Sequence, residues 1–144
     1  MKLTRNDIAI LSRILSGVKI NCVSDADAKK KLMTCYLEIR KAQKESDGEQ
    51  NEILQKFQDD WKDEIIAVAK LREAKAEVAG HDKYLAAEND FNQMIGDVLS
   101  KEVEVTIEKF PASVLYDSEL WGKDDTMGQI ANSVEFLMEK GIAE

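Results

Sequence analysis

The chain has 144 residues, 44% of them hydrophobic and 33% charged, so it carries enough apolar side chains for a folded core. Its formal net charge of −8 argues against non-specific nucleic-acid binding, because the phosphates would repel it. No apolar run approaches the roughly 18–20 residues that a membrane span needs, and the opening residues lack the apolar segment of a signal peptide. We therefore expect a single cytoplasmic domain over residues 1–144.

The charge is unevenly distributed along the chain. Residues 1–23 carry +3 and residues 24–46 carry +2, whereas residues 47–79 carry −4 and residues 80–144 carry −9. A basic front and an acidic rear can complement each other within one molecule or between copies. We expect complementarity within one molecule, together with a solvated acidic surface.

A first helix is predicted from about Arg5 to Ser16. Thr4 is a good N-cap, Asp7 favours the positive end of a helix, and Gly17 is a natural stop. After this helix, residues 18–23 alternate apolar and polar side chains, which predicts a short strand. The apolar face of the helix consists of Ile8, Leu11, Ile14 and Leu15.

The longest predicted feature is a helical hairpin over residues 25–79. Both arms carry apolar side chains at steps of three and four residues, as in an antiparallel coiled coil. Ser46-Asp47-Gly48 lies between the arms and predicts the turn, and Phe57 and Trp61 are expected in the hairpin core. The two faces are Ala28, Leu32, Cys35, Tyr36, Ile39 and Ala42 in the first arm, and Leu54, Phe57, Trp61, Ile65, Val68, Leu71 and Val78 in the second.

The rest of the chain predicts a helix over residues 83–100, a strand over residues 102–110 and a C-terminal helix over residues 126–140. A lone strand leaves its backbone groups unpaired, so it needs a mate. Residues 18–23 are the obvious mate within the chain, and a strand of another copy is the alternative. The expected fold class is mainly α, with a long antiparallel helical hairpin, shorter helices and a minor two-stranded β element.

The open edge of the predicted strand is the expected partner-binding site. Charged residues at a strand edge disfavour pairing with an identical acidic strand, whereas a basic or neutral strand of a partner protein can add there. The isolated protein is expected to be a monomer or a homo-oligomer, specifically a dimer, formed through helices, with this edge free for a partner. Neither a nucleic acid nor a membrane is an expected partner. The edge residues are Val103, Val105, Ile107, Glu102, Glu104 and Glu108.

We expect no catalytic, cofactor-binding or metal-ligating residues. Cys22, Cys35 and His81 are one ligand short of a zinc site built only from cysteine and histidine. One acidic group has the helical spacing that can hold magnesium, as in all-helical nucleotide pyrophosphohydrolases, but a matching acidic set on a facing helix fits poorly. We interpret this group, Asp59, Asp60, Asp63 and Glu64, as a solvated face.

The order of parts resembles that of known proteins along most of the chain. The features concerned are the Met1-Lys2-Leu3 opening, Lys29-Lys30-Lys31 at the start of the charged hairpin, Glu102-Val103-Glu104-Val105 before Ile107-Glu108-Lys109-Phe110, and Val114-Leu115 and Leu137-Met138 in a leucine-bearing tail. In these features the chain resembles a family of short phage-encoded proteins of uncharacterised function. The resemblance implies phage or prophage origin, a role near virion assembly and a virion-associated location, and it carries no catalytic residues to transfer.

Taken together, these features favour a non-enzymatic protein-interaction or assembly factor. A metal-dependent enzyme of the all-helical nucleotide pyrophosphohydrolase type is one alternative. A regulator that binds one host protein is the other.

Overall fold

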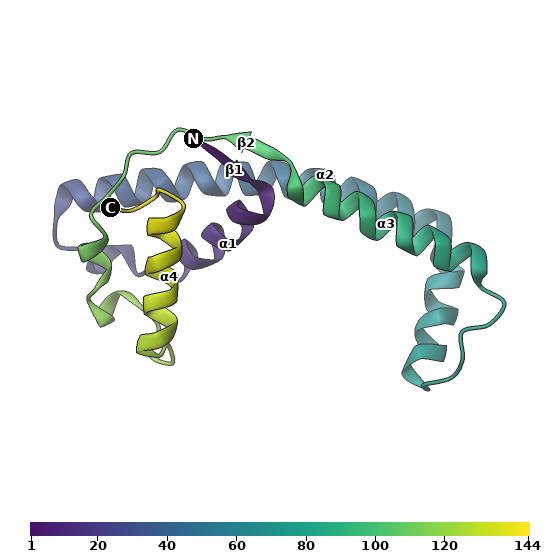
Figure 1. The fold of residues 1–144 in the computed structure, drawn as a ribbon. Helices are drawn as coiled ribbons and strands as arrows, with labels where there is room; N and C mark the ends of the chain where they lie inside the picture. Colours follow the sequence, from purple (N-terminus) through teal and green to yellow (C-terminus); the bar gives the residue numbers. More distant parts are fainter. The chain divides into compact units, whose positions relative to one another are not determined.

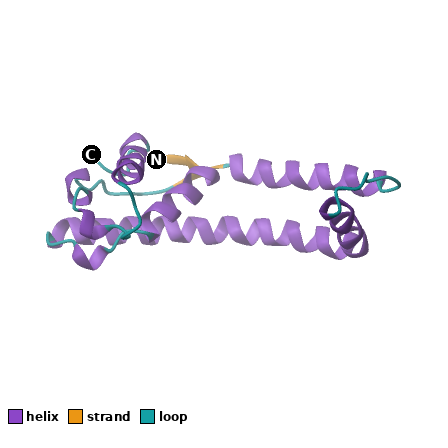
Figure 2. Cartoon of the chain, turned by 90° about the horizontal axis from the view of Figure 1, so that it is seen from below, coloured by secondary structure: helices purple, strands orange, loops and turns teal.

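The computed structural model describes residues 1–144 and is mainly helical, with one small antiparallel sheet (Figures 1 and 2). This confirms the predicted fold class. None of the helices combines the length and apolar character that crossing a bilayer requires. The elements are β1 (Lys2–Thr4), α1 (Arg5–Ser16), α2 (Ala26–Glu73), α3 (Asp82–Ser100), β2 (Glu102–Glu104) and α4 (Met127–Glu139), with short 3-10 helices at Ile20–Cys22, Ala112–Leu115 and Ser118–Leu120.

The chain divides into two compact units. Met1–Lys44 and Glu102–Glu144 form the first, which we call the core unit, and Glu45–Lys101 form the second, which we call the helical-pair unit. Helix α2 contributes residues 26–44 to the core unit and residues 45–73 to the helical-pair unit. The expectation that all 144 residues form one domain stays a prediction.

The core unit contains nearly all of the buried apolar side chains. Helices α1 and α4 and residues 26–44 of α2 supply its helical walls (Figure 1). The face predicted for the first hairpin arm is confirmed in this stretch. Its buried residues are Leu3, Ile8, Leu11, Leu15, Val23, Ala28, Leu32, Cys35, Ile39, Val105, Phe110, Ala112, Leu115, Leu120, Trp121, Val134, Leu137, Ile142 and Ala143.

The ends of α1 and α4 follow the capping chemistry of the sequence. The Thr4 hydroxyl accepts a hydrogen bond from the Asp7 amide, the Asp7 carboxylate accepts one from the Thr4 amide, and α1 runs from Arg5 to Ser16 as predicted. Thr126 caps α4 in the same reciprocal way. Gly141, with φ +76°, ends α4 in a left-handed conformation, and the Ile142 amide donates back to the Leu137 carbonyl.

The turn predicted at Ser46-Asp47-Gly48 is wrong, because α2 continues through these residues. One glycine costs a helix only about 1 kcal/mol, and the flanking lysine, glutamate and glutamine residues are strong helix formers. The reversal comes later, in residues 74–81. There Lys75 takes φ 54°, and the Ala76 amide donates to the Leu71 carbonyl, which ends α2 before the predicted limit at Ala79.

The predicted strand pairing is also wrong. Residues 18–23 contain a 3-10 turn in place of a strand, and the strand predicted over residues 102–110 is limited to β2. The mate of β2 is β1, antiparallel, with Leu3 opposite Val103. Strand β1 has three residues, too few to produce an alternating pattern in the sequence.

The helical-pair unit consists of residues 45–73 of α2 and helix α3. Helix α2 is kinked at Trp61, which has φ −127° and ψ 24°, and residues 45–61, before the kink, run antiparallel to α3 (Figure 1). The pairing follows from contacts that run in opposite directions: Glu49 with Lys101, Phe57 with Phe91, and Trp61 with Tyr84. Only Val68, Tyr84 and Val98 are fully buried apolar residues here. The core positions predicted for Phe57 and Trp61 are therefore wrong: both are only partly buried, because two helices alone share a single seam.

Cysteine reactivity tests the placement of α2 against the core unit. Cys35 is 1% exposed, and burial raises the pKa of its thiol to about 12, whereas Cys22 is exposed. Iodoacetamide should therefore alkylate Cys22 in the native protein and Cys35 only after guanidinium is added, as read by peptide mass spectrometry. Rapid alkylation of Cys35 in the native protein would contradict the burial of this face.

Candidate functional site

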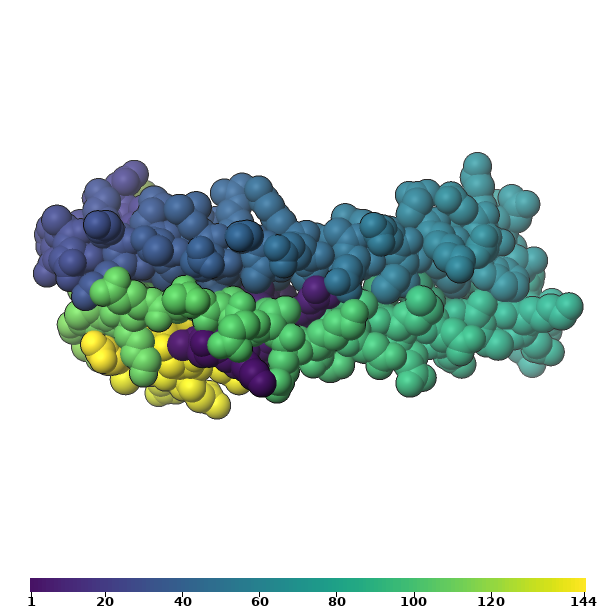
Figure 3. Space-filling view, turned by 90° about the horizontal axis from the view of Figure 1, so that it is seen from above, coloured from purple at the N-terminus to yellow at the C-terminus, as the bar shows by residue number.

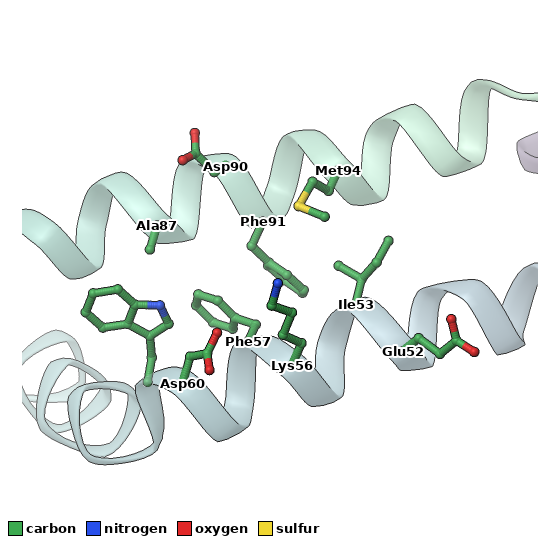
Figure 4. Close-up of a pocket in the computed structure, with 10 residues that line it drawn as sticks. Glu52, Ile53, Lys56, Phe57, Asp60, Ala87, Asp90, Phe91 and Met94 are labelled. Carbon is green, nitrogen blue, oxygen red and sulfur yellow. The ribbon is translucent and has the colours of Figure 1, made fainter.

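An open apolar groove lies along the seam of the helical-pair unit (Figure 4). Its volume is about 340 Å³. Helix α2 contributes one wall and α3 the other, and Phe57 and Phe91 point into the space between them (Figure 4). The lining residues are Glu52, Ile53, Lys56, Phe57, Asp60 and Trp61 from α2, and Ala87, Asp90, Phe91 and Met94 from α3.

The floor of the groove is a cluster of aromatic rings. Phe57 stacks on Phe91 with ring centroids 4.5 Å apart, and Tyr84 contacts both Phe57 at 5.9 Å and Trp61 at 6.0 Å. Of these rings only Tyr84 is fully buried, and the neighbouring Met94 is 49% exposed. The groove therefore leaves part of an aromatic cluster and a methionine in contact with water.

The surroundings of the groove are acidic. The helical-pair unit contains 14 acidic and 7 basic side chains, a net charge of −7. Asp60 and Lys56 reach into the groove, whereas the side chain of Asp90 points away from α2 (Figure 4). Glu52 and Asp90 are nevertheless among the residues that line the groove. No salt bridge within the chain involves the three carboxylates at the groove. The groove therefore presents apolar surface within a field of negative charge.

A hydrogen-bond network anchors the start of α3 to the end of α2. Arg72 donates to both carboxylate oxygens of Glu88, at 2.9 and 2.7 Å, and the Tyr84 hydroxyl donates to Glu88 at 3.0 Å. His81 Nδ1 pairs with the Glu64 carboxylate. The Arg72 guanidinium holds the pKa of Glu88 below its usual value of 4.5, although partial burial opposes the shift. These contacts position Tyr84 behind the groove.

The acidic group considered for metal binding does not converge on one point. Asp59 accepts a hydrogen bond from Gln55, Asp60 lines the groove, and Glu64 pairs with His81. Nowhere in the 144 residues do three or more histidine, cysteine, aspartate or glutamate side chains come together as a set of metal ligands.

The residues of the predicted partner-binding edge are spread over β2 and the segment that follows it. Glu102 to Glu104 form β2, Val105 is buried in the core unit, and Ile107 packs against the same core. Two of the edge glutamates are already paired within the chain: Glu104 with the Met1 amino group at 3.1 Å and Glu108 with Lys31 at 3.7 Å. Partner binding at this edge stays a prediction.

Sequence reasoning missed the groove because it placed the hairpin turn too early. With the turn at residues 46–48, Phe57 and Trp61 were assigned to a seam with residues 28–42. The signal that identifies the true pairing is the matching spacing of Ile53, Phe57 and Trp61 on one helix and Ala87, Phe91 and Met94 on the next.

No family model, no curated protein and no solved structure matches this chain.

The pairing of β1 with β2 makes a residue-level prediction for the strand edge. Met1 and Val105 exchange both backbone hydrogen bonds, so the alternation of an antiparallel ladder turns the Val103 amide toward β1 and the Glu104 amide away. Hydrogen exchange followed by NMR should find Val103 and Val105 protected and Glu104 fast. Equal protection of Val103 and Glu104 would show that both edges of β2 are paired.

The Arg72–Glu88 contact makes the stability of the helical-pair unit dependent on pH. The folded-state pKa of Glu88 lies below its ordinary value, so the ionised Glu88 carboxylate stabilises the helical-pair unit at neutral pH. This stabilisation is lost as the pH falls through the folded-state pKa. Amide exchange in α3 should accelerate in Glu88→Gln at neutral pH, and the difference from the wild-type rate should disappear as the pH falls below 4.5 and Glu88 becomes protonated in the folded protein. The control Asp97→Asn, an exposed position on α3, should leave the neutral-pH rates unchanged.

Proposed function

We propose that this chain is a non-enzymatic protein-interaction or assembly factor, and that the groove of the helical-pair unit is its docking site. The observation that carries the proposal is the open cluster of Phe57, Trp61, Phe91 and Met94 on an acidic unit. Covering these apolar side chains with a partner would remove them from water, which is favourable.

The chemistry of the groove favours a basic amphipathic helix as the ligand. Grooves between two helices accept a third helix, whose apolar side chains at i, i+3, i+4 and i+7 enter the groove. Aromatic rings and a flexible methionine adapt to such side chains. Lysine and arginine side chains flanking the apolar stripe would meet the lining carboxylates Glu52, Asp60 and Asp90.

The resemblance to phage-encoded proteins supports an assembly setting for this interaction, with phage or prophage origin as part of the proposal. A regulator of one host protein would use the same groove, so that alternative differs in the partner and not in the site. No converged ligand set favours the enzyme alternative.

Binding of a labelled model helix tests the proposal. The labelled peptide consists of leucine and lysine, patterned as a basic amphipathic helix. Its fluorescence anisotropy should rise on titration with the full chain, and the rise should saturate at micromolar protein concentration. Phe91→Ala removes an aromatic ring from the floor and should weaken binding about tenfold or more. Met94→Ala, at an exposed position, should weaken it without loss of helical circular dichroism.

The matched control is Ile66→Ala, which removes an equally exposed apolar side chain of the same unit outside the groove. It should bind the peptide as the wild type does. A glutamate-for-lysine version of the peptide should bind more weakly because of the negative charge around the groove. Absence of saturable binding, or equal binding by Phe91→Ala and the wild type, would refute the groove as a docking site.

A further inference from the structure

The outward face of α2 in the core unit is a preformed basic amphipathic surface. Residues 26–44 bury Ala28, Leu32, Cys35 and Ile39 on one side, and every residue of the opposite stripe is exposed. Figure 3 shows atoms of this stretch, in indigo and blue, uncovered on the face in view. We call this stripe the basic face; it consists of Lys30, Met33, Thr34, Leu37, Arg40, Lys41 and Lys44.

The basic face has the pattern that the groove requires. Met33 is 40% exposed and Leu37 is 54% exposed, four residues apart and therefore adjacent on one side of the helix. Lys30, Arg40, Lys41 and Lys44 surround these two side chains, and none of the four forms a salt bridge within the chain. Glu38, at the flank and partly buried, is the one carboxylate beside the middle of the stripe.

We propose that the occupant of the groove is the basic face of a second copy of this chain. The complementarity is of two kinds: Met33 and Leu37 match the apolar floor, and the unpaired cations match the unpaired carboxylates Glu52, Asp60 and Asp90. The aliphatic stems of the lysines add apolar contact while their ammonium groups stay at the edges. The inference rests on the proposed function, since it names the partner of the same groove.

The contact is head-to-tail and not two-fold symmetric. A symmetric contact of groove with groove would bring together two units of net charge −7, which repel each other. A contact of basic face with groove joins unlike surfaces and leaves one free groove and one free basic face at the ends. Such heterologous contacts propagate into open chains or close into rings.

Sedimentation velocity of the full chain is the first test. The weight-average sedimentation coefficient should rise across about 10 to 500 μM protein, and the rise should shrink at high salt, because ions screen the edge charges. Leu37→Glu on the basic face and Met94→Glu in the groove should each abolish the rise. Both positions are exposed, so circular dichroism should remain that of the wild type.

Mixing the two variants is the decisive experiment. In a head-to-tail contact, Leu37→Glu keeps an intact groove and Met94→Glu keeps an intact basic face, so an equimolar mixture should form a heterodimer and stop there. Met138→Glu and Ile66→Glu are the matched controls, with exposed apolar positions outside both surfaces, and both should self-associate as the wild type does. A monomeric wild type, or a mixture that fails to dimerise, overturns the proposal.

Failure of the self-association proposal can be distinguished from failure of the groove as a docking site. If the wild type is monomeric but the leucine-lysine helix still binds in a way that requires Phe91, the groove serves a different protein and the proposed function stands. If neither the second copy nor the model helix binds, both proposals fall.

Discussion

A helix that packs against neighbours on one side alone leaves its other side exposed to water. This constraint on α2 governs the rest of the structure. In the core unit the Leu32, Cys35 and Ile39 side of α2 belongs to the buried cluster that also contains residues of α1 and α4, and the opposite side faces water. In the helical-pair unit it meets only α3, and the seam is open to water at the groove. The two exposed surfaces are therefore consequences of the same helix having too few neighbours.

The distribution of charge gives these two surfaces opposite character. The exposed side of residues 26–44 is basic, whereas the helical-pair unit has twice as many acidic as basic side chains. The cations of the basic face and the carboxylates that line the groove form no salt bridges within the chain. Lys31, by contrast, forms salt bridges with Asp27 and Glu108. Surface charge that is left unpaired next to exposed methionine and leucine side chains adds little to the stability of the fold.

Local rules predicted the elements well and their pairing poorly. Thr4, Asp7 and Gly17 define α1 because capping acts within a few residues, and the same holds for Thr126 and Gly141 at the ends of α4. The hairpin turn was misplaced because Ser46-Asp47-Gly48 is a turn signal only if flanking residues do not favour a helix more strongly. In the true reversal, Gly80 with φ +80° is a turn signal that the sequence shows, whereas Lys75 is a left-handed non-glycine residue that leaves little trace in a sequence. The groove could not be predicted without that turn, because the turn brings α3 alongside α2 and these two helices form the walls of the groove.

The backbone at Trp61 connects the groove with the direction of the chain. Trp61 has φ −127° and ψ 24°, outside the helical range, so α2 bends at a residue that also lines the groove. Its indole lies edge-on to Tyr84, which is hydrogen-bonded to the Glu88 that Arg72 holds. The kink and the groove therefore share one residue: a change in the backbone angles at Trp61 would redirect the last turns of α2 and move the indole that lines the groove at the same time.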